Sequence, residues 1–184
     1  MVVLRRLPEL ALVALAAAPA AAFAVDYLSA EQAARLMFPD ADRFDAVDLQ
    51  LGAAQMRKLE DAGVRARSAR WRVNVARKQG STLGWIVMDE VIGKFELISY
   101  AAGIGTDGAV RQIAVLSYRE SHGSEVRLPA WRRQFVGKRS GDAIELGRDI
   151  ANISGATLSC RHLSEGVKRI IELVQLLRSD GGLK

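Results

Sequence analysis

Four β-rich segments follow one another in the middle of the chain with only short turns between them. They span residues 70–77, 83–88, 94–102 and 109–119. The first alternates charged and apolar residues, so that Trp71, Val73 and Val75 fall on one face. Thr106-Asp107-Gly108 gives a turn signal just before the last segment. Strands joined in this way pair with their chain neighbours, which predicts an antiparallel sheet.

Helical segments flank these strands on both sides. Ser29 and Gln32 have the spacing of a capping box, and the helix that they open should end before Pro39. A second helix is expected at about 53–62, a short one at 129–135, and a long one at the C-terminal end. The long helix has one apolar stripe, formed by Leu163, Val167, Ile170, Ile171, Val174 and Leu177. The sequence therefore predicts an α+β fold, an antiparallel sheet with flanking helices.

Residues 1–24 have the pattern of a secretory signal peptide. A short apolar stretch follows Arg5 and Arg6, and small residues stand at the cleavage positions Ala22 and Ala24. We divide the rest into an N-terminal helical segment, 25–68, and a single cofactor-binding domain, 69–180. Within the former, the acidic residues from Asp40 to Asp48 predict a solvated turn, because they lack the glycine and the glutamate of a calcium loop.

Composition narrows the chemistry that the chain could perform. Its 184 residues contain one cysteine, Cys160, and two histidines, His122 and His162. An internal disulfide is thereby excluded, and a cysteine-based metal site, a zinc centre or a haem is not expected. The net charge of +5 comes from scattered basic residues rather than one dense stripe, so nucleic acid is not an expected partner. Any redox chemistry would need an imported cofactor.

The segment Ile153-Ser154-Gly155-Ala156-Thr157-Leu158-Ser159 precedes the long helix. Small residues let a ligand approach the backbone, and the start of a helix offers free N–H groups and a positive dipole end. These features suit a phosphate group. Hydroxyl residues at such positions are also common helix N-caps, so the residues alone leave both interpretations of Thr157 and Ser159 open.

The element S-G-A-T-L-S resembles the flavinylation motif of the FMN-binding domain family. Family members include the FMN subunits of Na⁺-pumping NADH:quinone reductase and of Rnf complexes. The resemblance covers roughly residues 84–178, with further landmarks at Gly84-Trp85, 89–94, 118–120 and 131–138. It implies that Thr157 accepts FMN from FAD through a phosphoester bond, made by an exported, magnesium-dependent flavin transferase. One position departs from the pattern, because Ala151 stands where many members have an acidic residue; Asp149 is a candidate substitute.

Residues around the motif are further candidates for binding FMN, on the chemistry of their side chains. Ser154 and Ser159 would hydrogen-bond the phosphate, and Gly155 and Ala156 would give it access. Further candidate ligands of FMN are Glu120 for binding the ribityl chain or tuning the ring, Lys94 for negative charge on the reduced ring, and Trp131 for stacking. Each of these residues also has an ordinary alternative: Lys94 could be solvated, Glu120 could be exposed at a strand end, and Trp131 could pack in the core.

The implied function is electron transfer outside the cytoplasm by a tethered flavin. The partners would be a flavin transferase and a membrane or periplasmic electron donor and acceptor, which is compatible with peripheral membrane association. Two alternatives stay open at this point. One is an oxidoreductase with dissociable FMN, and the other is a non-redox periplasmic binding or assembly module.

Overall fold

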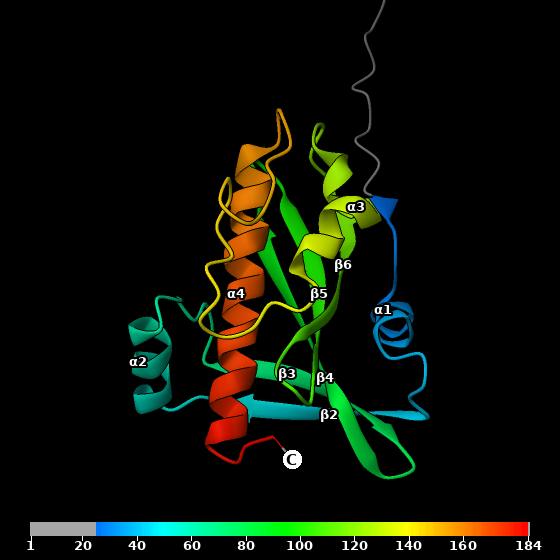
Figure 1. Ribbon diagram of the computed structural model, residues 1–184, viewed down its shortest axis with the longest axis vertical. Coiled ribbons are helices and arrows are strands. Elements are labelled where there is room, and N and C mark those ends of the chain that lie inside the picture. Colours follow the sequence, from blue (N-terminus) through cyan, green and yellow to red (C-terminus); the bar gives the residue numbers. More distant parts are fainter. Residues whose placement is uncertain (1–24, 184) are drawn as a thin grey trace, which may run out of the picture.

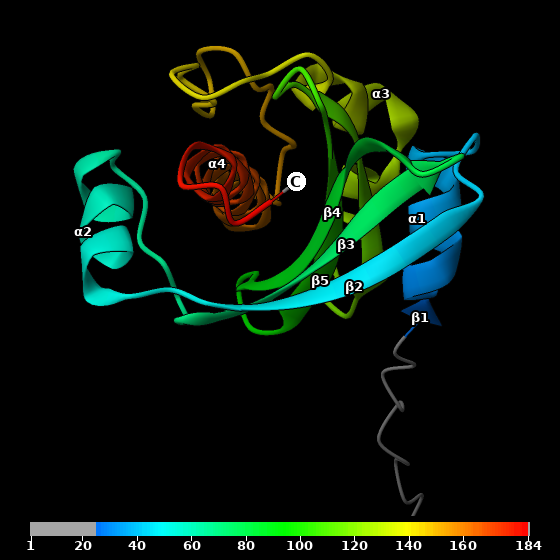
Figure 2. The same cartoon turned by 90° about the horizontal axis from the view of Figure 1, so that it is seen from below.

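The computed structural model describes residues 25–183, which fold as one six-stranded sheet with helices on both faces (Figures 1 and 2). The strand order is β1-β6-β5-β4-β3-β2, and all neighbours are antiparallel. The strands are β1 (Val25–Asp26), β2 (Arg43–Gln50), β3 (Arg70–Lys78), β4 (Ser81–Ile92), β5 (Leu97–Gly105) and β6 (Val110–Tyr118). The helices are α1 (Ala30–Met37), α2 (Ala53–Asp61), α3 (Pro129–Arg132) and α4 (Thr157–Ser179), with short 3₁₀ turns η1 (Ser124–Arg127) and η2 (Arg133–Phe135). The predicted α+β fold is confirmed.

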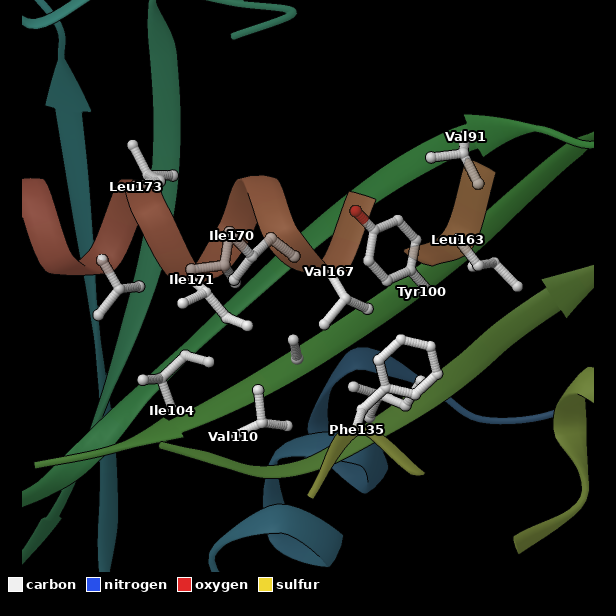
Figure 3. Close-up of a cluster of buried hydrophobic side chains, with 14 of the residues drawn as sticks. Val91, Tyr100, Ile104, Val110, Phe135, Leu163, Val167, Ile170, Ile171 and Leu173 are labelled. Carbon is white, nitrogen blue, oxygen red and sulfur yellow. The ribbon is translucent and has the colours of Figure 1, made fainter. Parts of the chain in front are cut away.

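Helix α4 lies in the concave face of the sheet, which curves around it (Figure 2). Its apolar stripe packs on the strands, where Leu163, Val167 and Ile170 meet the buried side chains of Tyr100 and Ile104 (Figure 3). Each fully buried side chain of this size contributes roughly 1.5–3 kcal/mol to folding. This packing fixes where the first turn of α4 lies.

The opposite face of the sheet is covered by α1 (Figure 2). Met37 and Phe38 pack there against Ile86 and small residues of the central strands. The predicted capping box is present: the Gln32 N–H donates to Ser29 Oγ at 3.1 Å, and the Ser29 N–H donates to Gln32 Oε1 at 2.8 Å. The capping box therefore fixes where α1 begins, and its apolar face fixes which side packs on the sheet.

A buried ion pair joins α4 to the sheet. Arg169 is 7% exposed, and its Nε and Nη2 donate to Asp89 Oδ2 of β4 at 3.0 and 2.6 Å. The hydroxyl of Tyr100 donates to the same oxygen at 3.0 Å. Burial raises the pKa of Tyr100 well above its usual value, so this hydroxyl stays a donor. The pair fixes the register of α4 along its axis, because apolar packing alone is not directional.

The predicted acidic turn at Asp40 to Asp48 is wrong for most of its length. Residues 43–50 form the edge strand β2. Arginines on β3 compensate the carboxylates: Arg72 lies directly opposite Asp48 and donates to it at 2.7 Å, and Arg77 donates to Asp45 at 2.9 Å. Opposite charges facing each other across two strands stabilise the pairing, a long-range relation that no local pattern reveals.

Three predicted boundaries also differ. The segment 25–68 is not purely helical, since it supplies both edge strands of the sheet. Residues 89–92, predicted as a turn, continue β4, because Asp89 pairs with Tyr100 across the hairpin and is compensated by Arg169. Helix α4 starts at Thr157, so part of the motif lies inside its first turn. The predicted signal peptide, 1–24, lies outside the described residues. None of the helices within residues 25–183 is long and apolar enough to cross a membrane.

The ion pair yields a stability prediction. Asp89→Ala leaves the Arg169 guanidinium buried without its counter-charge, so the free energy of unfolding should fall by about 3–5 kcal/mol. Urea unfolding followed by circular dichroism measures this loss. The matched control is Asp48→Ala, which breaks an exposed pair and should leave the midpoint nearly unchanged. Equal midpoints for the two variants would contradict the proposed role of the pair.

Candidate cofactor site at the start of α4

Thr157 is the first residue of α4 and is exposed to solvent. The N-cap is Ala156, which makes no side-chain capping bond, so the capping interpretation of Thr157 and Ser159 is wrong. The Oγ1 of Thr157 accepts a hydrogen bond from Asn152 Nδ2 at 3.1 Å. An exposed hydroxyl thus stands beside the N–H groups of a first helical turn, which have no acceptor inside the helix.

A cleft of about 410 Å³ opens beside this turn. Its walls come from the hairpin between β4 and β5, from the segment after β6, and from the motif. The lining residues are Lys94, Phe95, Glu120, Ser121, His122, Gly155, Ala156, Thr157, Leu158 and Ser159. The predicted candidates Lys94, Glu120, Gly155, Ala156, Thr157 and Ser159 are therefore brought together in one place.

Glu120 holds the tip of the β4–β5 hairpin. Its Oε1 accepts the N–H groups of Phe95 at 2.6 Å and Glu96 at 3.0 Å. Partial burial disfavours its charge, but the bonds from these backbone donors and the nearby Lys94 outweigh burial and lower the pKa of Glu120. Gly93 permits the contact, because a Cβ there would lie 2.3 Å from the same Oε1. Glu120 thus shapes the cleft and does not extend a free carboxylate into it.

His162 holds the other side of the hairpin end. Its Nδ1 lies 2.6 Å from the carbonyl oxygen of Ile92, one turn along α4 from the motif. With this ring nitrogen protonated, His162 donates to that carbonyl and ties the hairpin to the helix. The imidazole is therefore a positioning group for the cleft wall, and its Nδ1 is not directed at the motif.

The segment after β6 packs closely on the motif. Gly123 has φ +83°, and a Cβ there would meet Ala156 Cβ at 2.1 Å. The Tyr118 hydroxyl lies 3.3 Å from Ser159 Oγ and also bonds the carbonyl of His122. Burial raises the pKa of Tyr118 and outweighs the bond to Ser159. Ser159 is only 3% exposed and its hydroxyl is bound by Tyr118, although the residue still contributes to the lining of the cleft.

Two predicted ligands lie elsewhere. Trp131 is buried in the core, where its ring packs edge-on against Phe135 with the ring centroids 5.1 Å apart. Its Nε1 donates to the carbonyl of Ala151 at 2.8 Å. The predicted stacking role of Trp131 is not supported, because the ring does not line the cleft and instead anchors the segment before the motif. Ser154 occupies an exposed turn outside the lining residues.

Asp149 does not take the place of the acidic residue missing at Ala151. Its carboxylate binds Lys138 Nζ at 2.7 Å and accepts the N–H groups of Ile144 and Glu145 at 3.0 and 2.6 Å. Burial opposes ionisation, but these bonds prevail and the pKa of Asp149 is lowered. Asp149 therefore stabilises the loop before the motif through contacts that are already satisfied.

Four lining residues were missed by sequence reasoning: Phe95, Ser121, His122 and Leu158. Leu158 lies within the motif and could have been found from its position next to Thr157. The other three depend on the hairpin register and on the path of the chain after β6, which are tertiary features.

Comparison with known protein families finds a match over the part of the chain that forms the cleft. Residues 93–172 match the model of the family described as the FMN-binding domain. The match begins at the hairpin tip and ends in α4, so it includes every residue that lines the cleft. Residues 93–172 therefore match the FMN-binding domain family, as the motif predicted, and this match supports FMN as the cofactor.

The chain is also similar to a curated protein in sequence and to a solved structure in fold. One is a subunit of the proton-translocating ferredoxin:NAD(+) oxidoreductase complex of Clostridium ljungdahlii, 27% identical over 107 residues, which are 54% of this chain and 57% of the relative. The chain thus matches little more than half the length of that relative. The crystal structure of Shewanella oneidensis NqrC shares the fold, with a TM-score of 0.54, 14% identity and coverage of 80% of this chain and 88% of that one.

The Glu120 clamp yields a pH prediction. Since the pKa of Glu120 is lowered from 4.5, its carboxylate should hold the hairpin tip above pH 4.5 and release it as the pH falls through the lowered pKa. The amide proton resonances of Phe95 and Glu96 should titrate together with a midpoint below 4.5. Glu120→Gln should remove this titration, and the exposed control Glu125→Gln should not. A midpoint that survives in Glu120→Gln would disprove the clamp.

Proposed function

We propose that this protein is an exported electron-transfer flavoprotein that carries FMN covalently on Thr157. One observation carries the proposal: the Thr157 hydroxyl is exposed at the start of α4, beside a cleft, and has no capping role. A threonine that only capped the helix would turn its oxygen back onto the backbone N–H groups. Here the oxygen stays accessible to a phosphorus electrophile.

The residues present fit a phosphate ester at this position. The first turn of α4 presents backbone N–H groups and the positive end of the helix dipole, which favour a nearby negative charge. Lys94 adds an exposed cation on the facing wall, and Asn152 already binds the hydroxyl oxygen. The carboxylate of Glu120 is directed into the hairpin backbone. The site thereby accommodates an anion without an opposing free carboxylate.

The attachment reaction needs no oxidant. The Thr157 oxygen attacks the FMN-side phosphorus of FAD, so the Oγ1–P bond forms, the pyrophosphate bond breaks, AMP leaves and the hydroxyl proton is released. A magnesium-dependent flavin transferase outside the cytoplasm is the proposed catalyst. A covalent tether suits an exported protein, because a dissociated cofactor would be lost to the surroundings.

Once bound, FMN supplies one- and two-electron redox chemistry. The protein contributes position and electrostatics through the motif, the hairpin tip and the clamp that joins them. The proposed donor and acceptor are membrane-bound or periplasmic redox proteins, because a similar protein is a subunit of a ferredoxin:NAD(+) oxidoreductase complex. Export rests on the pattern of residues 1–24, which predicts a mature chain beginning at Val25.

Intact mass of the exported protein, produced with a flavin transferase, tests this proposal. We expect a chain beginning at Val25 with an added mass equal to FMN less water. Thr157→Ala should lose the added mass completely, because its side chain has no nucleophile. Ser154→Ala is the matched control, since it removes an exposed hydroxyl of the same motif outside the cleft lining and should keep the modification.

Two other results would contradict the proposal. Unmodified yellow protein that releases FMN on denaturation would support the dissociable oxidoreductase instead. Unmodified colourless protein would support a non-redox binding or assembly module.

A further inference from the structure

The tip of the β4–β5 hairpin presents a large aromatic side chain to solvent. Phe95 is 72% exposed, the highest value among the exposed large hydrophobic side chains of the described residues. Leu158, 40% exposed, lines the same cleft from α4. The Nζ of Lys94 lies 4.8 Å from the centre of the Phe95 ring. The cation and the ring attract each other, and the other face of the ring and Leu158 leave apolar surface beside the cleft that a ligand can cover.

The hairpin tip that carries Phe95 is fixed to the rest of the protein by hydrogen bonds. Glu120 accepts the N–H groups of Phe95 and Glu96, and the Gly93 N–H donates to the carbonyl of Glu96 at 2.7 Å within the turn. His162 binds the Ile92 carbonyl just before the tip. The backbone therefore holds Lys94 and Phe95 in place at the mouth of the cleft. Such preorganisation lowers the entropic cost of binding a ring there.

We infer that Phe95 and Lys94 form the binding surface for the isoalloxazine ring of the flavin attached to Thr157. The inference rests on the proposed function and extends it to the ring. A second protein is a weaker candidate occupant, because both side chains line the same 410 Å³ cleft as Thr157, so a group tethered at Thr157 reaches them first. The chemistry also matches: Phe95 and Leu158 offer apolar contact to an aromatic ring, and Lys94 offers a positive charge to a reduced, anionic one.

Flavinylated protein allows a direct test that does not depend on electron-transfer activity. Intact mass first establishes that the wild type and each variant carry the flavin. Visible circular dichroism then reports the asymmetric surroundings of the ring, and acrylamide quenching of flavin fluorescence reports its accessibility. An aromatic contact of about 0.5–1.5 kcal/mol corresponds to an approximately two- to tenfold shift in the ratio of docked to free ring.

We therefore expect Phe95→Ala to lose visible dichroism and to gain acrylamide accessibility, with the docked-to-free ratio falling by about two- to tenfold. Phe95→Tyr should retain the wild-type spectra. Leu128→Ala is the control, since Leu128 is 51% exposed and lies outside the cleft lining. Lys94→Gln should lower the reduction potential of the flavin, and Lys94→Arg should restore it, because the cation favours the negatively charged reduced ring.

Loaded Phe95→Ala protein with wild-type dichroism and quenching would overturn this inference alone, and would leave Phe95 as a docking surface for a redox partner. An unmodified wild-type chain would instead overturn the proposed function, and this inference with it. The mass measurement separates the two failures.

Discussion

The packing of α4 into the concave face of the sheet is the interaction on which the rest of the structure depends. Its apolar stripe sets the depth of the helix, and the buried contact between Arg169 and Asp89 sets its position along the axis. These two restraints bring the first turn of α4 to the end of the β4–β5 hairpin. Without that juxtaposition, Thr157 would be an exposed hydroxyl with no facing wall, and no cleft would exist for a cofactor.

The cleft is then completed by groups that act on the backbone of its walls. Glu120 binds the hairpin tip, His162 binds the end of β4, and Gly123 lets the segment after β6 approach the motif. The charged and aromatic groups left facing the cleft, Lys94 and Phe95, have no comparable structural role. This division between groups that shape the site and groups that remain available is typical of a preorganised binding site. It connects the fold directly to the proposed tethering of FMN.

Local patterns predicted much of this molecule. The capping box at Ser29, the alternation of β3 and the apolar stripe of α4 each rest on short-range periodicity, and each is confirmed. The strand β2 was missed because its carboxylates are compensated by arginines on β3, which are far away in sequence. Trp131 was assigned to the flavin although it packs against Phe135 in the core, and Phe95 was missed because its place at the cleft depends on a contact with the distant Glu120. A motif identifies the residue that reacts, but only the tertiary path of the chain identifies the residues that face it.

We propose that the cleft between the hairpin tip and the start of α4 holds the flavin. A crystal structure of the exported, flavin-loaded protein tests it most directly. We expect continuous density from Thr157 Oγ1 into a phosphate at the first turn of α4, with the ring lying between that turn and the hairpin tip. Density for the flavin at another surface, such as the arginine-lined cleft of Arg111, Arg132 and Arg133, with Thr157 unmodified, would contradict it.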